Sequence, residues 1–178
     1  MKLIRIRFRS ALLGAAVLFT SIASAGWVYD DSEAKDLRIR DDQGNWDFTV
    51  AKTVVDGVNR LTITKTNAGS GELDLTDFDV EGYDLYQFGT GNGLLSKTEG
   101  TVGYATGTLK LPQSVKVLGS YACQNSVITA VEAPGVEIIG MRSFQNNTVL
   151  ETAYFPALTN VTGYGNHPSF TSPALTSL

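Results

Sequence analysis

Five acidic residues lie close together near the middle of the chain, at Asp74, Asp77, Asp79, Glu81 and Asp84. The segment Asp77-x-Asp79-x-Glu81-Gly82 has the residue types and spacing of the first half of an EF-hand calcium loop. The twelfth position of such a loop should be a glutamate that binds the ion through both oxygens, and here it is Phe88. We therefore interpret the run as a solvated strand edge whose charges oppose aggregation, with weak calcium binding as the alternative.

The only histidine and the only cysteine are the remaining candidates for catalysis or metal binding. His167 lies in the segment GYGNHPSF, and because it is the only histidine, a multi-histidine metal site is excluded. The sequence has no G-x-S-x-G elbow, the motif that would suggest a Ser-His-Asp triad. Cys123 has no partner for an internal disulfide, and we expect a buried, unreactive thiol. The chain is predicted not to be an enzyme and to need no cofactor or metal, although two carboxylates that meet in space could still hydrolyse a glycan.

Residues 1–25 have the three parts of an export signal. Four basic residues are followed by the apolar run ALLGAAVLFTSI at 11–22 and by the small residues Ala23-Ser24-Ala25. A helix over that run rises only about 18 Å, against roughly 30 Å of bilayer hydrocarbon, which argues against a membrane anchor. We expect cleavage after Ala25 and an exported protein (secreted, periplasmic or on the cell surface) whose mature chain has no transmembrane span.

Charge is unevenly distributed along the mature chain. Removal of the signal leaves ten basic and 18 acidic residues, a formal charge of −8. Residues 26–100 hold 15 acids and seven bases, whereas residues 101–178 hold three of each. An acidic surface repels phosphate backbones, so we expect no nucleic-acid partner.

Three prolines recur with a constant 22-residue period, at Pro112, Pro134 and Pro156. Apolar residues alternate in front of each proline, most clearly from Ile128 to Ala133 and from Leu150 to Phe155. This pattern is typical of a short strand with one buried face. Such strands, stacked about 4.8 Å apart, would form a parallel sheet over a continuous core.

A second shared segment follows the prolines, VKVLG at 115–119 and VEIIG at 136–140. The pairs Ala122-Cys123 and Ser143-Phe144 come next, and an asparagine then stands three residues before the next strand's first apolar position, at Asn125 or Asn147. We expect these asparagines to satisfy inward-facing backbone groups of their own and the neighbouring coil. The two units differ by a slip of one residue before the strand, which a loop can absorb.

The segments LGSYACQN and IGMRSFQNNTVLETAYFP resemble the BspA-type leucine-rich repeats of bacterial surface and secreted proteins. The likeness covers roughly residues 105–178. The second unit fits almost position by position, the first has Cys123 in place of phenylalanine, and the third carries the insertion GYGNHPSF before Leu175-x-x-Leu178. Because the third unit ends without a polar cap, we expect a truncated product or coverage by another chain. The resemblance implies adhesion, or binding of host or matrix proteins.

The predicted fold is mainly β, with a short leucine-rich-repeat solenoid at 105–178, a parallel sheet of 22-residue coils. A β-rich, acidic N-terminal cap or small β domain is expected at 26–104, joined through the glycine-rich stretch 89–107. Strands are predicted at 46–53, 60–66, 71–78 and 83–89, with turns at Asp56-Gly57 and 67–71.

Alignment of the repeat strands places Lys110, Glu132 and Tyr154 at one outward position of adjacent coils, about 5 Å apart. A second row holds Thr129 and Glu151, with Ala130 and Thr152 beside it. We predict that this surface binds a protein or glycan ligand outside the cytoplasm. The alternative is a structural component of the cell envelope that self-associates through its uncapped C-terminal coil.

Overall fold

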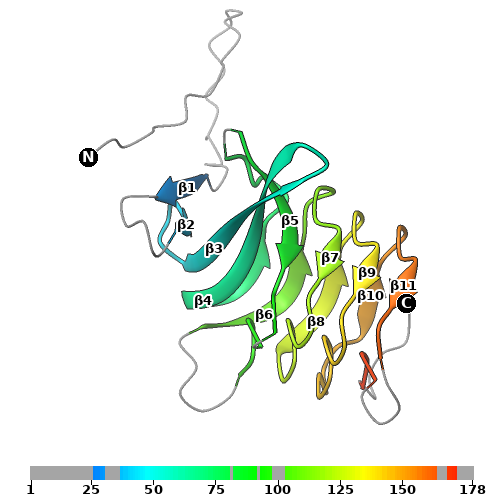
Figure 1. Cartoon of the computed structure of the whole chain (residues 1–178). Helices are drawn as coiled ribbons and strands as arrows, with labels where there is room; N and C mark the ends of the chain where they lie inside the picture. The colour runs from blue at the N-terminus through cyan, green and yellow to red at the C-terminus, as the bar shows by residue number, and fades with distance from the viewer. Residues whose placement is uncertain are drawn as a thin grey trace, which may run out of the picture.

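The computed structural model describes residues 26–30, 37–80, 82–91, 93–97, 103–163 and 168–171. These ranges contain strands and turns but no helix, so the prediction of a mainly β chain is confirmed (Figure 1). A helix long and apolar enough to cross a membrane is accordingly absent from the described ranges. The strands are β1 (Trp27–Asp30), β2 (Arg38–Asp41), β3 (Trp46–Val55), β4 (Val58–Asp74), β5 (Asp84–Phe88), β6 (Gly103–Lys110), β7 (Val117–Leu118), β8 (Val127–Glu132), β9 (Ile138–Ile139), β10 (Thr152–Tyr154) and β11 (Asn160–Val161).

Two ladders of parallel strands start from β4 (Figure 1). The first half of β4 pairs with β5, which is followed by β7, β9 and β11. The end of β4 pairs with β6, which is followed by β8 and β10. Leu109, Val131 and Ala153 are aligned in the second ladder, so the 22-residue period of the sequence is the register of these strands. In the first ladder Val117 pairs with Ile138, one position short of that period.

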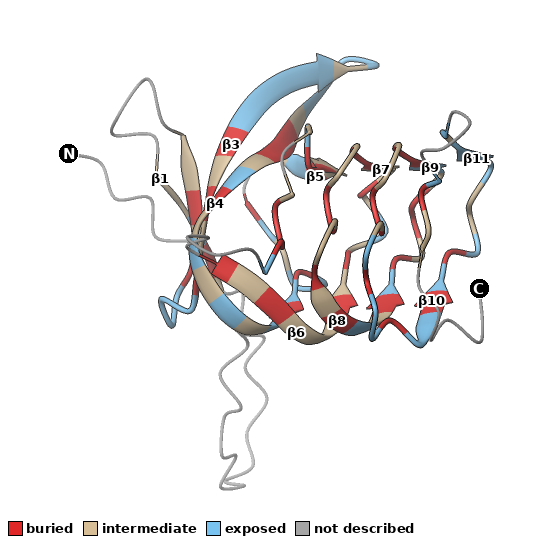
Figure 2. Cartoon of the chain, turned by 90° about the horizontal axis from the view of Figure 1, so that it is seen from below, coloured by how far each residue is buried: buried red, intermediate tan, exposed pale blue. Residues whose placement is uncertain are grey.

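Buried residues recur at the same place in successive coils (Figure 2). In β8, Ile128 and Val131 are buried, whereas Thr129 and Glu132 are exposed. Stacking of the coils makes these buried positions one continuous core, which removes apolar surface from water that a single short strand would leave exposed.

An antiparallel sheet of β1, β2 and β3 continues into β4 and covers the first coil. The Trp46 and Phe48 rings stack with centroids 5.5 Å apart, and Phe48 meets Phe88 of β5 edge-on at 6.5 Å. The ring centroids of Trp27 of β1 and Phe48 are 6.0 Å apart. The first half of the chain therefore shares its core with the coils, and β5 lies in the same ladder as β7 although it precedes residue 105.

Residues 67–71, predicted to form a turn, lie inside β4. Gly69, with φ of 155°, lies under the indole of Trp46, where a Cβ would be 2.0 Å from the ring. The glycine is therefore needed for close approach of the strand to the cap rather than for a turn. One 17-residue strand thus belongs to both ladders, since Leu61 lies in the part that pairs with β5 and Leu73 in the part that pairs with β6. Leu61 and Leu73 are 12 residues apart, which is too short for a full coil, and they lie on the two different sides of the stack.

The hairpin between β3 and β4 is confirmed at Asp56-Gly57, whose φ angles are 53° and 76°. Two central residues with positive φ match the twist of the flanking strands, and aspartate followed by glycine tolerates this conformation. The strand predicted at 71–78 ends earlier, at Asp74.

The two asparagines predicted to be equivalent have different environments. Asn147 is fully buried, and its Oδ1 accepts hydrogen bonds from the N–H and the hydroxyl of Ser126, each 2.8 Å long. Asn125 instead matches Asn146, since both backbones have positive φ and Asn146 Nδ2 donates to Asn125 Oδ1 at 2.9 Å. Among contacts between described residues, the predicted capping of a neighbouring coil's backbone is therefore confirmed for Asn147, whereas Asn125 contacts a side chain. The one-residue slip lies between Asn147 and the strand that follows.

Backbone hydrogen bonds also link the segments that join the two ladders. The N–H of Cys123 donates to Ser143 O at 2.8 Å, and the N–H of Phe144 donates to Ser169 O at 2.7 Å. The Phe144 and Phe170 rings stack with centroids 4.9 Å apart. Ser169 and Phe170 are therefore the third unit's own small and large pair, and the prediction that they belong to the insertion is wrong.

Some sequence predictions concern residues outside the described ranges. They are the export signal at 1–25, Glu81 of the acidic run, His167 of the insertion, and the segment from Leu175 to Leu178.

Candidate binding surface

The β4–β6–β8–β10 ladder carries the residues predicted to bind a ligand. Its register sets Lys110 beside Glu132 and Glu132 beside Tyr154, so the three residues form one row across successive coils. Neighbouring strands in such a ladder are about 4.8 Å apart. Tyr154 is 59% exposed, which leaves most of its ring available to a partner.

Asp74 extends this row by one strand and was not predicted as part of it. Asp74 is paired with Lys110 in the register, and its carboxylate accepts a hydrogen bond from Lys110 Nζ at 3.1 Å. The two residues are further apart in the sequence than the 22-residue period, so the repeat alignment could not reveal the pairing. The signal in the sequence was the presence of Asp74 one residue before the buried Leu75, in a strand whose apolar residues alternate.

The charges of this pair influence each other. Burial disfavours the charged form of Asp74, but hydrogen bonds from Thr76 and from Lys110 outweigh that effect and hold the pKa of its carboxyl below the usual value. The hydrogen bond to Asp74 raises the pKa of Lys110, and the nearby Glu132 and Glu72 add to that shift. Lys110 is therefore a cation held among carboxylates rather than a receptor for an added anion.

The second predicted row lies in the same ladder. The N–H of Glu151 donates to Thr129 O at 2.9 Å, and Ala130 is paired with Thr152. Thr129, Glu151 and Thr152 are exposed. The structure thus brings all six predicted residues to one region along this ladder, where Lys110 is half-buried and the other five are exposed: Lys110, Thr129, Glu132, Glu151, Thr152 and Tyr154.

This region is anionic, with four carboxylates against one lysine: Glu72, Asp74, Glu132, Glu151 and Lys110. The Glu72 carboxylate also receives the Thr108 N–H at 3.4 Å. Carboxylates and threonine hydroxyls accept hydrogen bonds from sugar hydroxyls or basic side chains, and an exposed tyrosine ring adds apolar contact area. The arrangement is suited to recognition.

The residues first considered for catalysis or metal binding lie in other environments. Cys123 is fully buried, and burial raises the pKa of its thiol, as expected for an unreactive cysteine. Asp84 of the acidic run accepts a hydrogen bond from Arg60 Nη1 at 2.7 Å. In the part of the chain that the structure describes, no three His, Cys, Asp or Glu side chains gather as a metal site would require.

Comparisons of this chain with protein-family models, with curated proteins and with solved structures found no match. The functional proposal below therefore depends on the residues and their geometry.

Proposed function

We propose that this chain is an exported binding protein of the BspA-type leucine-rich-repeat class, which recognises a protein or glycan through the exposed side of β4–β6–β8–β10. One observation carries the proposal: Asp74, Lys110, Glu132 and Tyr154 form a single row across four adjacent strands. Stacked repeats commonly bind partners through extended surfaces of this kind. The signal-like residues 1–25 support export.

The chemistry of the row favours ligands that donate hydrogen bonds. Glu132 and Glu151 are exposed acceptors, and the Tyr154 ring provides a rigid apolar surface with a hydroxyl at its end. Sugar hydroxyls above the ring, or a lysine or arginine beside Glu132, fit this arrangement.

A glycan array together with a set of basic peptides would test the proposal. The mature chain and the double variant Glu132→Gln/Tyr154→Ser would be compared with a control, Ile138→Thr/Asn160→Ser, whose positions are exposed on the other ladder. We expect the first double variant to lose about tenfold or more in affinity for any ligand found, and the control to retain it. Equal affinities for both variants would contradict the assignment of the surface.

The alternative role in assembly predicts a different solution behaviour. An envelope component that pairs through its repeats should form larger species as its concentration rises. Light scattering of the mature chain should instead show a monomer over the range in which ligand binding is measured.

A further inference from the structure

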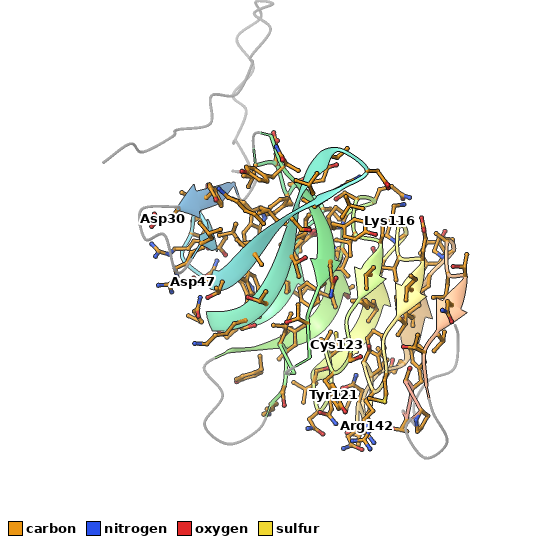
Figure 3. All side chains as sticks on the ribbon, in the orientation of Figure 1. Asp30, Asp47, Lys116, Tyr121, Cys123 and Arg142 are labelled. Atoms are coloured by element: carbon orange, nitrogen blue, oxygen red, sulfur yellow. The ribbon has the colours of Figure 1, made fainter. Side chains whose placement is uncertain are left out.

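Tyrosine rings in this chain are regularly paired with cations. Of the six tyrosines in the described ranges, five have a lysine or arginine over the ring, with the cationic group 5.2–5.8 Å from the ring centroid. Figure 3 shows one such pair, Tyr121 with Arg142. The other pairs are Tyr29 and Tyr83 with Lys52, Tyr86 with Arg60, and Tyr104 with Lys97.

Tyr154 differs from these five residues. No lysine or arginine of the described ranges lies over its ring. It is also the only exposed tyrosine of the six, since the other five are half-buried. Its ring therefore has a face that a cation of another molecule can reach.

One of the internal pairs shows how a tyrosine and a carboxylate hold an arginine on a sheet. Arg60 Cζ is 5.3 Å from the centroid of Tyr86, and Arg60 Nη1 donates to Asp84 at 2.7 Å. Asp84 and Tyr86 are two residues apart in β5, so their side chains leave the same face of the strand. A guanidinium can make both contacts at once, because it is a planar group with five donor hydrogens.

Glu132 and Tyr154 place the same two groups side by side on the ladder that carries the proposed binding surface. They are partners in the register of β8 and β10, so they lie on strands about 4.8 Å apart, and both are exposed. Within the described ranges, Lys110 forms its ion pair with Asp74, and the Glu132 carboxylate has no hydrogen bond or ion pair. The carboxylate and the ring are therefore available together.

The surroundings of this pair favour a cation. The hydrogen bond to Asp74 and the charges of nearby carboxylates raise the pKa of Lys110, so the field along this row favours positive charge. On the same face, two residues earlier in β8 and β10, stand Ala130 and Thr152. Their small side chains leave room beside the ring for a long side chain to approach.

We propose that Glu132 and Tyr154 receive an arginine side chain of a protein partner, with the guanidinium over the ring and its N–H groups on the carboxylate. The inference rests on the proposed function, because it names the ligand class of that same surface. Arginine fits better than lysine, since its planar fork can bind both carboxylate oxygens while its face lies on the ring. A neutral glycan could lie on the ring, but it would bring no positive charge to the carboxylate.

Fluorescence anisotropy of labelled peptides, titrated with the mature chain, tests this inference. The probe is a short peptide in which arginine alternates with threonine. Two matched peptides carry lysine, or the uncharged arginine analogue citrulline, in place of each arginine. At about 0.15 M salt, which screens attraction between distant charges, we expect the arginine peptide to bind about fivefold or more tightly than the lysine peptide. The citrulline peptide should show no measurable binding.

Single substitutions separate the two contacts. Glu132→Gln should weaken binding of the arginine peptide by about tenfold, since charge-assisted hydrogen bonds are lost. Tyr154→Leu keeps an apolar side chain but removes the aromatic face, and should weaken binding about three- to fivefold, whereas Tyr154→Phe should bind like the native chain. The matched control Asp56→Asn removes one negative charge at the β3–β4 turn, where asparagine tolerates the positive φ, and should leave the affinity unchanged. Unchanged urea midpoints, expected at exposed positions, would verify that the variants are folded.

Several results would overturn the inference, and they differ in what they mean for the proposed function. Equal affinities of the arginine and lysine peptides, or of Tyr154→Leu and Tyr154→Phe, would contradict arginine recognition alone. Absence of arginine-peptide binding up to about 1 mM would do the same if a glycan bound the native chain but not Glu132→Gln/Tyr154→Ser, and the proposed function would stand. Tight binding of the arginine peptide that survives in this double variant would place the site elsewhere and contradict both.

Discussion

The side-chain oxygen of Asn147 accepts two hydrogen bonds from Ser126 of the preceding coil, one from the backbone N–H and one from the hydroxyl. Both residues are buried, so water cannot replace Asn147 as a partner. The substitution Asn147→Leu has a similar size but leaves two donors unsatisfied, and we expect it to lower the free energy of unfolding by about 2–4 kcal/mol in urea titrations. The exposed neighbour gives a control, Thr148→Ala, whose effect should stay below about 0.5 kcal/mol. Similar losses in both variants would show that the buried amide has no special role.

Glycines permit the close stacking of the segments that join the two ladders. A Cβ on Gly140 would lie 2.4 Å from the backbone nitrogen of Ser120, which cannot move without separating the coils. We expect Gly140→Ala to cost about 1–3 kcal/mol of unfolding free energy. Gly44→Asn is the control, since that site has open space and a positive φ that asparagine tolerates. An unchanged unfolding midpoint for Gly140→Ala would mean that the coils are further apart than described.

Cys123 provides a chemical measure of stack opening. Because the thiol is buried and its pKa is raised, a disulfide reagent at mildly alkaline pH should react with it only when the protein unfolds. Cys123→Val should change the unfolding free energy by less than about 1.5 kcal/mol, whereas Cys123→Ser buries a hydroxyl and should cost about 1–3 kcal/mol. Rapid labelling of the native protein would place the thiol at the surface instead.

The Asp74–Lys110 pair predicts a small dependence of stability on pH. The pKa of Asp74 is lowered in the folded state, so its stabilisation is present above the unfolded value of about 3.9 and is lost as the pH falls through the folded value. Both side chains are more than a third exposed, so solvent screening should keep the contribution of the Asp74 carboxylate small at neutral pH. In urea titrations, the difference between the native chain and Asp74→Asn should therefore shrink from pH 7 to about pH 2.5. A difference that persists at the lower pH would contradict the assigned shift.

The coils that follow the 22-residue period could be predicted from the sequence. Apolar strand positions and the prolines after them repeat together, so aligning Pro112, Pro134 and Pro156 predicts the register of β6, β8 and β10. The placement of Glu132 beside Tyr154 follows from that register and is confirmed. The use of the row for binding stays a prediction.

Local patterns mislead where the reason for a residue lies far away in the sequence. Gly69 has the chemistry of a turn, and only its contact with Trp46 of the preceding strand explains why it lies within a strand. The insertion places Ser169 further from Ser143 than one repeat, so a search at the period of the prolines overlooks it. The pairing of Asp74 with Lys110 could not be predicted from the period of the prolines for the same reason, since the coil between them is longer than the repeat.

The cap strands β1 and β2 lie outside the repeats, so no repeated sequence pattern predicts them. Their pairing with β3 includes charge contacts of Asp47 with Arg38 and Arg40, together with the packing of Trp27 on Phe48. Such contacts depend on side chains that meet only after folding, and no short sequence pattern predicts them.

The row of residues proposed to bind a ligand depends on the parallel register of the coils, which spin labels would measure directly. In a Cys123→Val background, nitroxides at Glu132→Cys and Tyr154→Cys should lie on adjacent strands about 4.8 Å apart and show strong dipolar broadening in continuous-wave electron paramagnetic resonance. Labels at Glu132→Cys and Asn160→Cys, on different ladders, are the control and should show much less. Strong broadening in the first pair alone is the predicted result. A first-pair spectrum equal to the sum of its single labels would contradict the register and the row of residues built on it.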